Sequence, residues 1–336
     1  MPDLSVNYLG FKLKNPVVVS SSGLTSTLDS AVECVNNGAG AVVMKSIFEE
    51  QIMRETHELE DQYQSNYHTE AADYINRMSF EHSINEYLQL IKDVKDNVDV
   101  PVIGSINAGT LSGWTSFAKR IQDSGADAVE LNIFIIPSDL NQNSLDIEKT
   151  YINIVSNVKK ELSVPVAVKI GPFFTNTGNI VKQLADAGAD SVVLFNRFQT
   201  VSVKEEDLDD ARLSEGRWLS LPEESDLPKR WIASLYGDVK CDLSATSGVR
   251  NGADVISLVR SGASIVQIAS ALYLNGPEFI STLTDEIDKL LSEKGISSLS
   301  ELTGLDSYSK NKNVIKSDRL QYFKAISALN TMRGKK

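Results

Sequence analysis

The sequence predicts an α/β fold in which eight parallel strands, with helices between them, close into a barrel. Four segments share a Gly-Ala pair followed by an apolar strand with a polar end; they are NGAGAVVMK at 37–45, SGADAVELN at 124–132, AGADSVVLFN at 187–196 and SGASIVQIAS at 261–270. Four other apolar strands interleave with them, NPVVVSSSG at 15–23, VPVIGSINAG at 100–109, VPVAVKIGP at 164–172 and CDLSATSG at 241–248. Near-continuous Val, Ile, Leu and Ala is typical of a buried parallel sheet. The pattern therefore predicts a (β/α)8 TIM barrel.

Several segments between these strands predict helices. Apolar residues recur at three- and four-residue spacing in four of them, at 115–125, 147–162, 179–188 and 253–262. A glycine ends each of the short ones, which suits a left-handed C-cap. A doubly wound sheet is the alternative fold, but it usually carries GxGxxG after its first strand, and NPVVVSSSGLT lacks that motif.

Two connections are much longer than the others. Residues 47–100 follow the second strand and residues 198–240 follow the sixth. Long inserts at the carboxyl ends of barrel strands usually build or cover the site. The alternative is a peripheral decoration or a contact between subunits.

We expect one domain over residues 1–336, with the barrel core at about 15–290 and a helical tail at about 291–336. The tail predicts an extra C-terminal helix that packs on the barrel or on another subunit. Its apolar face consists of Leu320, Phe323, Ile326 and Leu329.

Composition limits the partners and the compartment. The 336 residues carry a net charge of −12, which argues against an extended nucleic-acid surface. Cys34 and Cys241 are far apart, which indicates neither a disulfide framework nor a metal site. The chain starts without a signal-peptide pattern, and no stretch approaches the roughly 20 apolar residues that cross a bilayer. We therefore expect a cytoplasmic protein without membrane, nucleic-acid or metal partners.

Polar residues gather where the eight strands end, which is the side of a barrel that carries the active site. They are Ser21, Ser22, Gly23, Lys45, Ser46, Ser105, Asn107, Asn132, Lys169, Asn196, Arg197, Thr246, Ser247, Gly248 and Ser270. The set holds amides, hydroxyls and cations, without a carboxylate or a histidine. It suits a planar heterocycle with several carbonyl and ring-nitrogen groups, together with a phosphate.

The last two strands form the usual phosphate corner of such barrels. Ser247-Gly248 and Ala269-Ser270 end them, and the short helix after each can point its positive end at an anion. Lys45 and Lys169 end other apolar strands. Because a buried lysine is costly unless paired, two converging lysines indicate a resident anion. For each lysine, an ordinary surface position or a structural ion pair is the alternative.

The chain resembles the dihydroorotate dehydrogenase family, whose members are FMN-dependent (β/α)8 barrels. The likeness extends from the opening to about residue 300. Its motifs are LSVNYLGFKLKNPVVVSSSG at 4–23, KS at 45–46, YINRM at 74–78, ELN at 130–132, PVAVK at 165–169, FN at 195–196, SGV at 247–249 and QIASAL at 267–272. Their order and spacing are specific together.

The resemblance implies roles for individual residues. Lys45, Asn132 and Asn196 would be catalytic, and Lys169 would face the N1/C2 carbonyl edge of the flavin. Substrate would be bound by Lys45, Asn76, Asn132, Asn196 and Arg197. FMN would be bound by Ser21, Ser22, Gly23, Lys45, Ser46, Asn132, Lys169, Asn196, Ser247, Gly248, Ala269 and Ser270.

The chain departs from the family pattern after Asn132. The family places a Cys or Ser base just before a proline, whereas this chain reads Ile133-Phe134-Ile135-Ile136-Pro137. Whichever register is chosen, Ile135 or Ile136 occupies the base position, and neither can accept a proton. Candidates for a replacement base are His57, His68 and His82, with Ser138 and Tyr63 as weaker ones.

Two further departures concern the connection between the sixth and seventh strands. Arg197 stands where the family has Ser or Thr, and the family's Gly-rich segment appears only as SEGRWLSLPEE. Arg197 and Arg77 could grip a carboxylate bidentately. Pairing with the acidic inserts, or solvation, is the alternative.

The main expectation is an FMN-dependent oxidoreductase that acts on a small anionic ring, with dihydroorotate of pyrimidine biosynthesis as the default substrate. Its partners would be that substrate and a soluble electron acceptor, and the resemblance allows a homodimer. A flavin-binding scaffold or sensor without turnover is the second hypothesis. A sugar-phosphate aldolase or isomerase with a Schiff base at Lys169 is the third.

Overall fold

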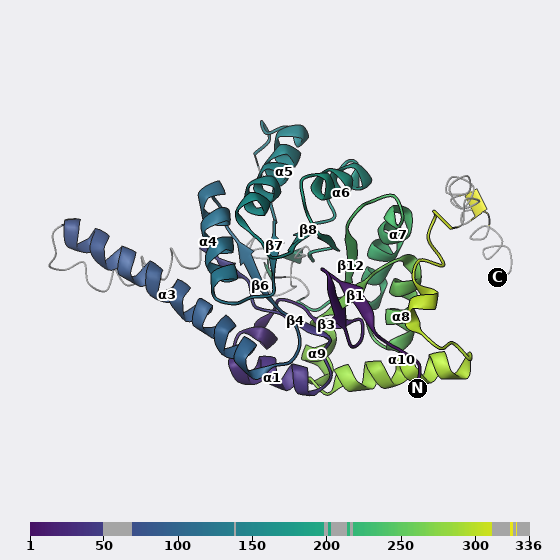
Figure 1. The fold of residues 1–336 in the computed structure, drawn as a ribbon. Coiled ribbons are helices and arrows are strands. Elements are labelled where there is room, and N and C mark those ends of the chain that lie inside the picture. Colours follow the sequence, from purple (N-terminus) through teal and green to yellow (C-terminus); the bar gives the residue numbers. More distant parts are fainter. Residues whose placement is uncertain are drawn as a thin grey trace.

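The computed structural model describes residues 1–49, 69–137, 139–197, 201–202, 214–215, 218–310, 323–324 and 327. Its eight parallel strands close into the barrel that the sequence predicts (Figure 1). In chain order they are β3 (Val17–Val19), β4 (Ala41–Val43), β6 (Val102–Asn107), β7 (Ala128–Asn132), β8 (Val166–Ile170), β9 (Ser191–Leu194), β12 (Asp242–Thr246) and β13 (Ile265–Ile268). Each strand pairs with the next, and β13 pairs with β3 to complete the ring.

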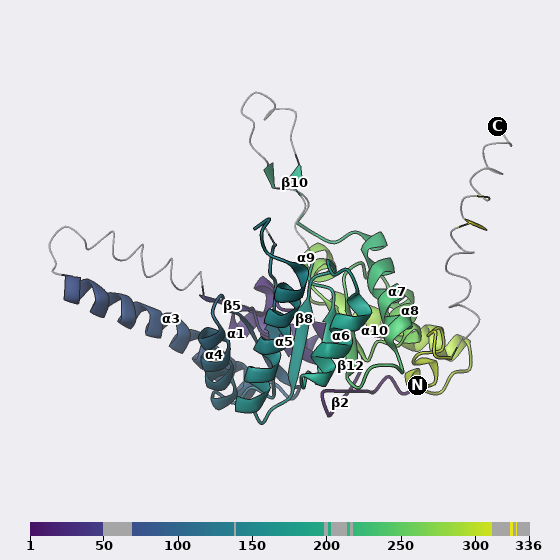
Figure 2. The same cartoon turned by 90° about the horizontal axis from the view of Figure 1, so that it is seen from above.

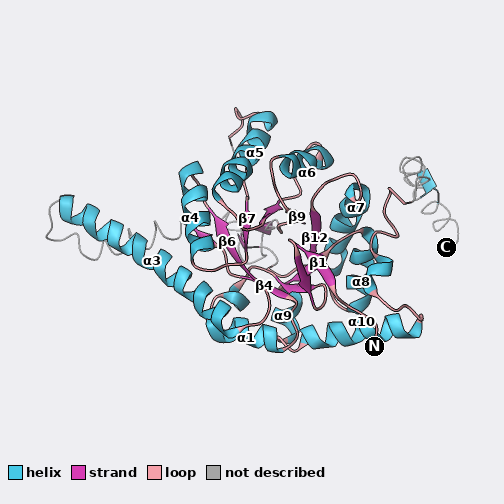
Figure 3. Ribbon diagram, viewed as in Figure 1, coloured by secondary structure: helices cyan, strands magenta, loops and turns pink. Residues whose placement is uncertain are grey.

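Helices surround the strands, as Figure 3 shows. They are α1 (Leu28–Asn36), α3 (Thr69–Asn97), α4 (Leu111–Asp123), α5 (Ser144–Glu161), α6 (Thr177–Asp186), α7 (Asp226–Leu235), α8 (Gly252–Ser261), α9 (Ser270–Asn275) and α10 (Phe279–Glu293). The four helices expected from spacing are confirmed as α4, α5, α6 and α8. Side-chain N-caps begin them, for example Asn143 for α5 and Asn176 for α6. Positive φ angles at Gly125, Gly188 and Gly262 confirm the left-handed helix ends.

An antiparallel hairpin that the sequence reasoning did not predict closes one end of the barrel. Its strands are β1 (Val6–Tyr8) and β2 (Phe11–Leu13). Leu9 and Gly10 both have positive φ, 52° and 82°, as a two-residue hairpin turn of primed type requires. Tyr8, Leu9 and Leu13 are buried against an apolar layer contributed by the barrel strands.

The barrel interior consists of an apolar layer with a polar layer above it. The apolar layer is Val18, Ala41, Val43, Ile103, Ala128, Ala167, Val193 and Ile265. Because strand side chains alternate, residues two positions further along also point inward. They include Ser20, Ser105, Glu130, Lys169 and Gln267, all buried. Outward-facing residues such as Val129 and Leu131 pack in the larger cluster with the helices.

The inserts leave the barrel at the end opposite the hairpin. In Figure 2, β2 and β10 (Val201–Ser202) lie at opposite ends of the molecule. Strand β10 pairs with β11 (Ser214–Glu215) inside the insert after β9, and the 3-10 helix η3 (Pro222–Ser225) leads into α7. Strand β5 (Ile47–Phe48) begins the insert after β4 and pairs with β6. Both inserts are thus on the side that the sequence predicts for the site.

The predicted C-terminal helix falls largely outside the described residues. Leu320, Ile326 and Leu329 belong to that part, whereas Phe323 is described and is 59% exposed. The last described elements before it are α10 and a 3-10 helix, η4 (Leu299–Leu302). Searching the described helices for a segment both long and apolar enough to cross a membrane finds none.

Candidate active site

A pocket of about 200 Å³ opens at the carboxyl ends of the barrel strands, and we call it the mouth pocket. It collects eight of the residues that the resemblance assigns to FMN or substrate, namely Ser21, Lys169, Asn196, Arg197, Ser247, Gly248, Ala269 and Ser270. Ser20 and Gln267 from the polar layer form its floor, and Trp218, Leu219 and Ser220 line it from the insert after β9. Residues from five strands and one insert therefore converge on a single cavity.

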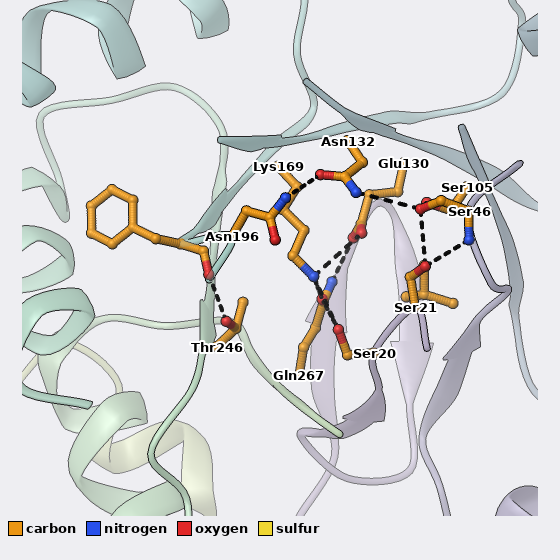
Figure 4. A network of polar contacts seen from close by, with 12 residues as sticks. Ser20, Ser21, Ser46, Ser105, Glu130, Asn132, Lys169, Asn196, Thr246 and Gln267 are labelled. Carbon is orange, nitrogen blue, oxygen red and sulfur yellow. Dashed lines mark hydrogen bonds and ion pairs between the residues drawn. The ribbon is translucent and has the colours of Figure 1, made fainter. Parts of the chain in front are cut away.

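Lys169 is the buried cation of the mouth pocket, with 6% of its surface exposed. Its Nζ donates to Ser20 Oγ at 3.0 Å and to Gln267 Oε1 at 3.2 Å (Figure 4). Glu130 Oε1 lies 3.8 Å from the same ammonium. Burial lowers the pKa of Lys169, and the nearby Glu130 charge opposes that shift.

Glu130 and Gln267 are site residues that the sequence reasoning missed. Glu130 is fully buried in β7, and its Oε2 accepts a 2.6 Å hydrogen bond from Gln267 Nε2. The expectation of a site without a carboxylate is therefore wrong. The signal was present, because Glu130 lies two residues before Asn132 and must point to the same side of the strand.

Asn132 and Asn196 form a pair of amides at the strand ends. Asn196 Nδ2 donates to Asn132 Oδ1 at 2.6 Å, and Asn132 Nδ2 lies 3.5 Å from Ser46 Oγ. These contacts fix both side chains, as Figure 4 shows. Asn196 keeps its carbonyl oxygen and one N–H for a ligand, so the pair can present an acceptor beside a donor.

Three hydroxyls continue this network toward β6. Ser46 Oγ lies 3.0 Å from Ser21 Oγ and 2.7 Å from Ser105 Oγ, and the Ser46 N–H donates to Ser21 Oγ at 2.8 Å. Tyr87 of α3 donates to the carbonyl of Ser105 at 2.9 Å. The first insert is therefore tied to the barrel directly behind the site.

Lys45 differs from Lys169 in its surroundings. It follows β4 by two residues and is exposed, and it is not among the described residues that line the mouth pocket. The structure thus contradicts the expectation that two lysines are buried together, because only Lys169 points inward beneath neighbouring strands. Ser46, the residue after Lys45, is buried.

The corner formed by β12 and β13 shows the backbone geometry of a binding loop. Ser247 and Gly248 both have positive φ, 77° and 75°. A left-handed serine costs energy and persists mainly where function or packing enforces it. A Cβ on Gly248 would lie 2.5 Å from the backbone nitrogen of Ser225, so the chain comes too close there for any other residue.

Ser220 from the second insert occupies this corner. Its Oγ accepts from the Gly248 N–H at 3.3 Å, and its own N–H donates to Ser270 Oγ at 2.9 Å. Groups at the ends of β12 and β13 thus form hydrogen bonds with the same residue, Ser220. An anion placed there would meet the same backbone and hydroxyl groups.

Two N–H groups at the start of α8, the helix after Ser247-Gly248, are bonded to protein side chains. The Gly252 N–H at the start of α8 donates to Glu286 Oε2 at 2.6 Å, and the Asp254 N–H donates to the N-cap Asn251 at 3.0 Å. The Glu286 carboxylate of α10 therefore compensates the positive end of the α8 dipole. In contrast, α9 begins at Ser270 in the pocket wall.

A sequence model of the family described as dihydroorotate dehydrogenase matches residues 3–291. The chain belongs to the dihydroorotate dehydrogenase family. Membership identifies it as a flavoprotein oxidoreductase of the dihydroorotate dehydrogenase type, acting on CH–CH bonds. The resemblance that the sequence motifs suggested is therefore confirmed.

Similar proteins include catalytic subunits of dihydroorotate dehydrogenase B (NAD(+)). The one from Thermoplasma acidophilum is 26% identical, covering 91% of this chain and 99% of its own length. That from Methanocaldococcus jannaschii is also 26% identical, covering 90% and 97%. That from Methanosarcina mazei is 27% identical, covering 88% and 93%.

The segment after β7, where the sequence analysis expects the position of the base, does not line the mouth pocket. Ile136 is 57% exposed, and the Ile135 N–H donates to Tyr151 Oη of α5 at 3.2 Å. Phe134, Ile135 and Tyr151 line a second, apolar pocket of about 250 Å³, which shares no residue with the mouth pocket. Apolar side chains pack there against Phe174 and α5.

Arg197, which was predicted to bind substrate, is held by protein groups. Its Nε lies 3.1 Å from Glu224 Oε2, and its Nη1 donates to the Trp218 carbonyl at 2.9 Å. Arg197 is therefore paired with an acidic residue of the second insert, which was the alternative to substrate binding. It also borders the mouth pocket. This pairing joins β9 to the second insert.

Of the five candidate replacement bases, only His82 has a side chain among the described residues. His82 lies on an exposed face of α3, with Nε2 3.2 Å from Glu86. The other candidate bases lie outside the described residues, namely His57, Tyr63, His68 and Ser138. The side chains of Asn76 and Arg77, which were predicted to bind substrate, are also outside them. Of the two cysteines, Cys34 is buried in α1, and burial raises its pKa to about 11. Burial also raises the pKa of Cys241, to about 12.

The loop after β3 completes the wall. Ser22 caps a short 3-10 helix, η1 (Gly23–Thr25), by accepting from the Leu24 N–H. A Cβ on Gly23 would lie 2.7 Å from Tyr273 Oη of α9, so the loop and that helix approach closely. Ser21 lines the mouth pocket, and Gly23 lies close to Tyr273, which lines the same pocket.

Proposed function

We propose that this protein is an FMN-dependent oxidoreductase that converts dihydroorotate to orotate, or oxidises a closely related anionic ring. The observation that carries this proposal is the convergence of a buried ammonium, an oriented amide and a backbone anion corner on one pocket. Family membership supports the reaction type. It also disfavours a Schiff-base role for Lys169.

The residues present fit FMN. Ser247, Gly248, Ala269 and Ser270 would hold its phosphate in place of the Ser220 contacts. Ser21, Ser22, Gly23 and Ser46 would lie along the ring system, with Lys45 at its exposed edge. FMN, when bound, supplies the two-electron acceptor for the substrate hydride. The Lys169 ammonium would stabilise the negative charge that arrives with that hydride.

The substrate would bind through side chains that offer both donors and acceptors. Asn132 and Asn196 match the alternating N–H and C=O groups of a dihydropyrimidine edge. We infer that Asn76 also binds the substrate ring and that Arg197 and Arg77 bind its carboxylate. Lys45, Asn132 and Asn196 would form the catalytic set, with Lys45 near both flavin and substrate. Arg197 could serve only by exchanging part of its Glu224 pairing for the ligand.

Proton removal is the step for which this chain lacks the family group. We propose that Ile135 replaces the base, because it lies nearer than Ile136 to the strand end and is less exposed. Loss of a general base commonly lowers a rate by ~10²–10⁴. A flavin-binding protein without dihydroorotate turnover is therefore the second candidate, and the apolar end of β7 favours it.

Electrons would leave through another protein or a soluble acceptor. The similar proteins are named catalytic subunits of NAD(+)-linked enzymes, which supports a partner subunit for this chain. We infer a single FMN-binding unit over residues 1–336 that works with a soluble acceptor and assembles as a homodimer or with such a subunit.

Purified protein tests these proposals directly. We expect a yellow protein that releases FMN on denaturation and loses its yellow colour when mixed anaerobically with dihydroorotate. A protein that stays colourless after FMN is added would reject the flavin proposal. If FMN binds but neither dihydroorotate nor related rings bleach it, the second candidate holds.

A further inference from the structure

In the polar layer beneath the mouth pocket, charged and neutral side chains are connected by hydrogen bonds. Glu130 Oε2 accepts from the Gln267 amide at 2.6 Å, and the carbonyl of the same side chain accepts from Lys169 at 3.2 Å. Ser20 Oγ donates to that carbonyl at 3.2 Å and accepts from Lys169 at 3.0 Å. Gln267 is therefore oriented by opposite charges at its two ends.

Glu130 is more than a structural acceptor in this chain. It is fully buried, yet its Oε1 has no hydrogen-bond partner among the described residues and lies 3.8 Å from the Lys169 ammonium. A buried carboxylate costs several kcal/mol unless a counter-charge accompanies it. Lys169 supplies that charge, and Glu130 is the carboxylate that faces it from within the barrel.

We propose that Glu130 is a positioning residue for the flavin reaction: its carboxylate keeps the Lys169 ammonium charged and directed at the cofactor, and so sets the reduction potential of bound FMN. This inference rests on the proposed FMN function. Lys169 lines the mouth pocket, whereas Glu130 does not, so Glu130 acts through the lysine.

Other groups around Lys169 cannot take over this role. Ser20 and Gln267 are neutral, and Tyr8, which approaches Glu130 from the hairpin, is a neutral phenol because burial raises its pKa. Arg197 borders the same pocket, but its charge is paired with Glu224. Tyr273 lines the pocket from α9. Glu130 is thus the one carboxylate among the described groups that contact Lys169.

The test is the midpoint potential of bound FMN as a function of pH in Glu130→Gln, with Glu130→Asp and Ser244→Ala beside it. At low pH, where Lys169 is charged in every variant, removal of the Glu130 charge should favour reduced over oxidised FMN at least ~10-fold, which is ~30 mV for a two-electron couple. As pH rises, Lys169 should lose its proton earlier in Glu130→Gln. The potential of that variant should therefore fall at lower pH than in the unaltered protein.

The two companion variants separate charge from packing. Glu130→Asp retains the carboxylate and should restore the unaltered pH profile. Ser244 is fully buried on β12 and interacts with Tyr8 rather than with Lys169, so Ser244→Ala should leave the profile unchanged. Coincident profiles for Glu130→Gln and the unaltered protein would overturn the proposal. A merely structural glutamate would change thermal stability without moving the profile.

A second measurement covers the case in which Glu130→Gln does not fold. Infrared spectra of the unaltered, FMN-loaded protein should show no protonated buried carboxyl group at neutral pH, since the proposal requires an ionised Glu130. A protonated carboxyl band that is displaced in Glu130→Asp would overturn it. If the unaltered protein binds no FMN at all, the proposed function itself fails, which is a distinct result.

Discussion

The mouth of the barrel has two sides of opposite character. Around β8, β9, β12 and β13, buried polar groups are oriented by hydrogen bonds, as between Lys169 and Gln267. The segment after β7 instead buries Phe134 and Ile135 in an apolar pocket beside α5. The comparison teaches that groups suited to holding a flavin and a ring gather on one side, whereas the segment after β7, where we propose that the base is replaced, is apolar.

Lys169→Met should have the largest effect on the polar side. Removing one partner of a buried pair commonly costs ~3–5 kcal/mol, because the remaining charge of Glu130 is uncompensated. We expect that loss in the free energy of unfolding by urea denaturation, together with lost FMN binding. Lys182→Met on the exposed surface of α6 is the control and should change stability by less than ~0.5 kcal/mol.

The stability difference between the unaltered protein and Lys169→Met should change with pH in a defined direction. Because burial lowers the pKa of Lys169, folding favours loss of its proton. The unaltered protein should therefore gain stability relative to Lys169→Met as pH rises from the lowered pKa toward the ordinary lysine value. A difference that is constant with pH would show that burial does not perturb this lysine.

Ile135→Cys tests the apolar side. Restoring a proton acceptor should raise dihydroorotate turnover by ~10² or more, if the residue type alone limits the reaction. Anaerobic stopped-flow reduction of the flavin measures this rate, with Ile136→Cys as the matched control. If neither thiol raises the rate, the path of the β7–α5 segment rather than its side chains excludes proton removal.

Gly248→Ala probes the anion corner. The added Cβ would meet the Ser225 nitrogen at 2.5 Å and the Pro222 carbonyl at 2.7 Å, so we expect a loss of ~1–3 kcal/mol in stability and weaker FMN binding. Gly125→Ala is the control, since it also has positive φ but open space around it. Equal effects of both substitutions on FMN affinity would argue against a binding role for the corner.

Arg197→Gln should have the smallest effect on stability. Its pair with Glu224 is partly exposed, and such pairs contribute at most ~1 kcal/mol. If Arg197 grips the substrate carboxylate, the substrate KM should rise while FMN affinity stays constant. Thermal unfolding and steady-state kinetics distinguish the two roles, and an unchanged KM would indicate that Arg197 serves to join β9 to the second insert.

The sequence by itself determined the eight strands, four of the outer helices and the convergence of Lys169, Asn132 and Asn196. These follow from local apolar patterns and from the rule that parallel strands end on one side. The exposure of Lys45 could not be read this way, because burial depends on which neighbouring segments cover a strand end.

Tertiary structure alone decided the contacts between distant residues. Glu130 and Gln267 lie 137 positions apart, and only barrel closure brings their side chains to 2.6 Å. Glu286 reaches the start of α8 because α10 packs beside it. Strand alternation indicated that Glu130 points inward, but its partners depend on how β7, β8 and β13 are arranged around the axis. A local pattern fixes the direction of a side chain, whereas the packing of all eight strands fixes what it meets.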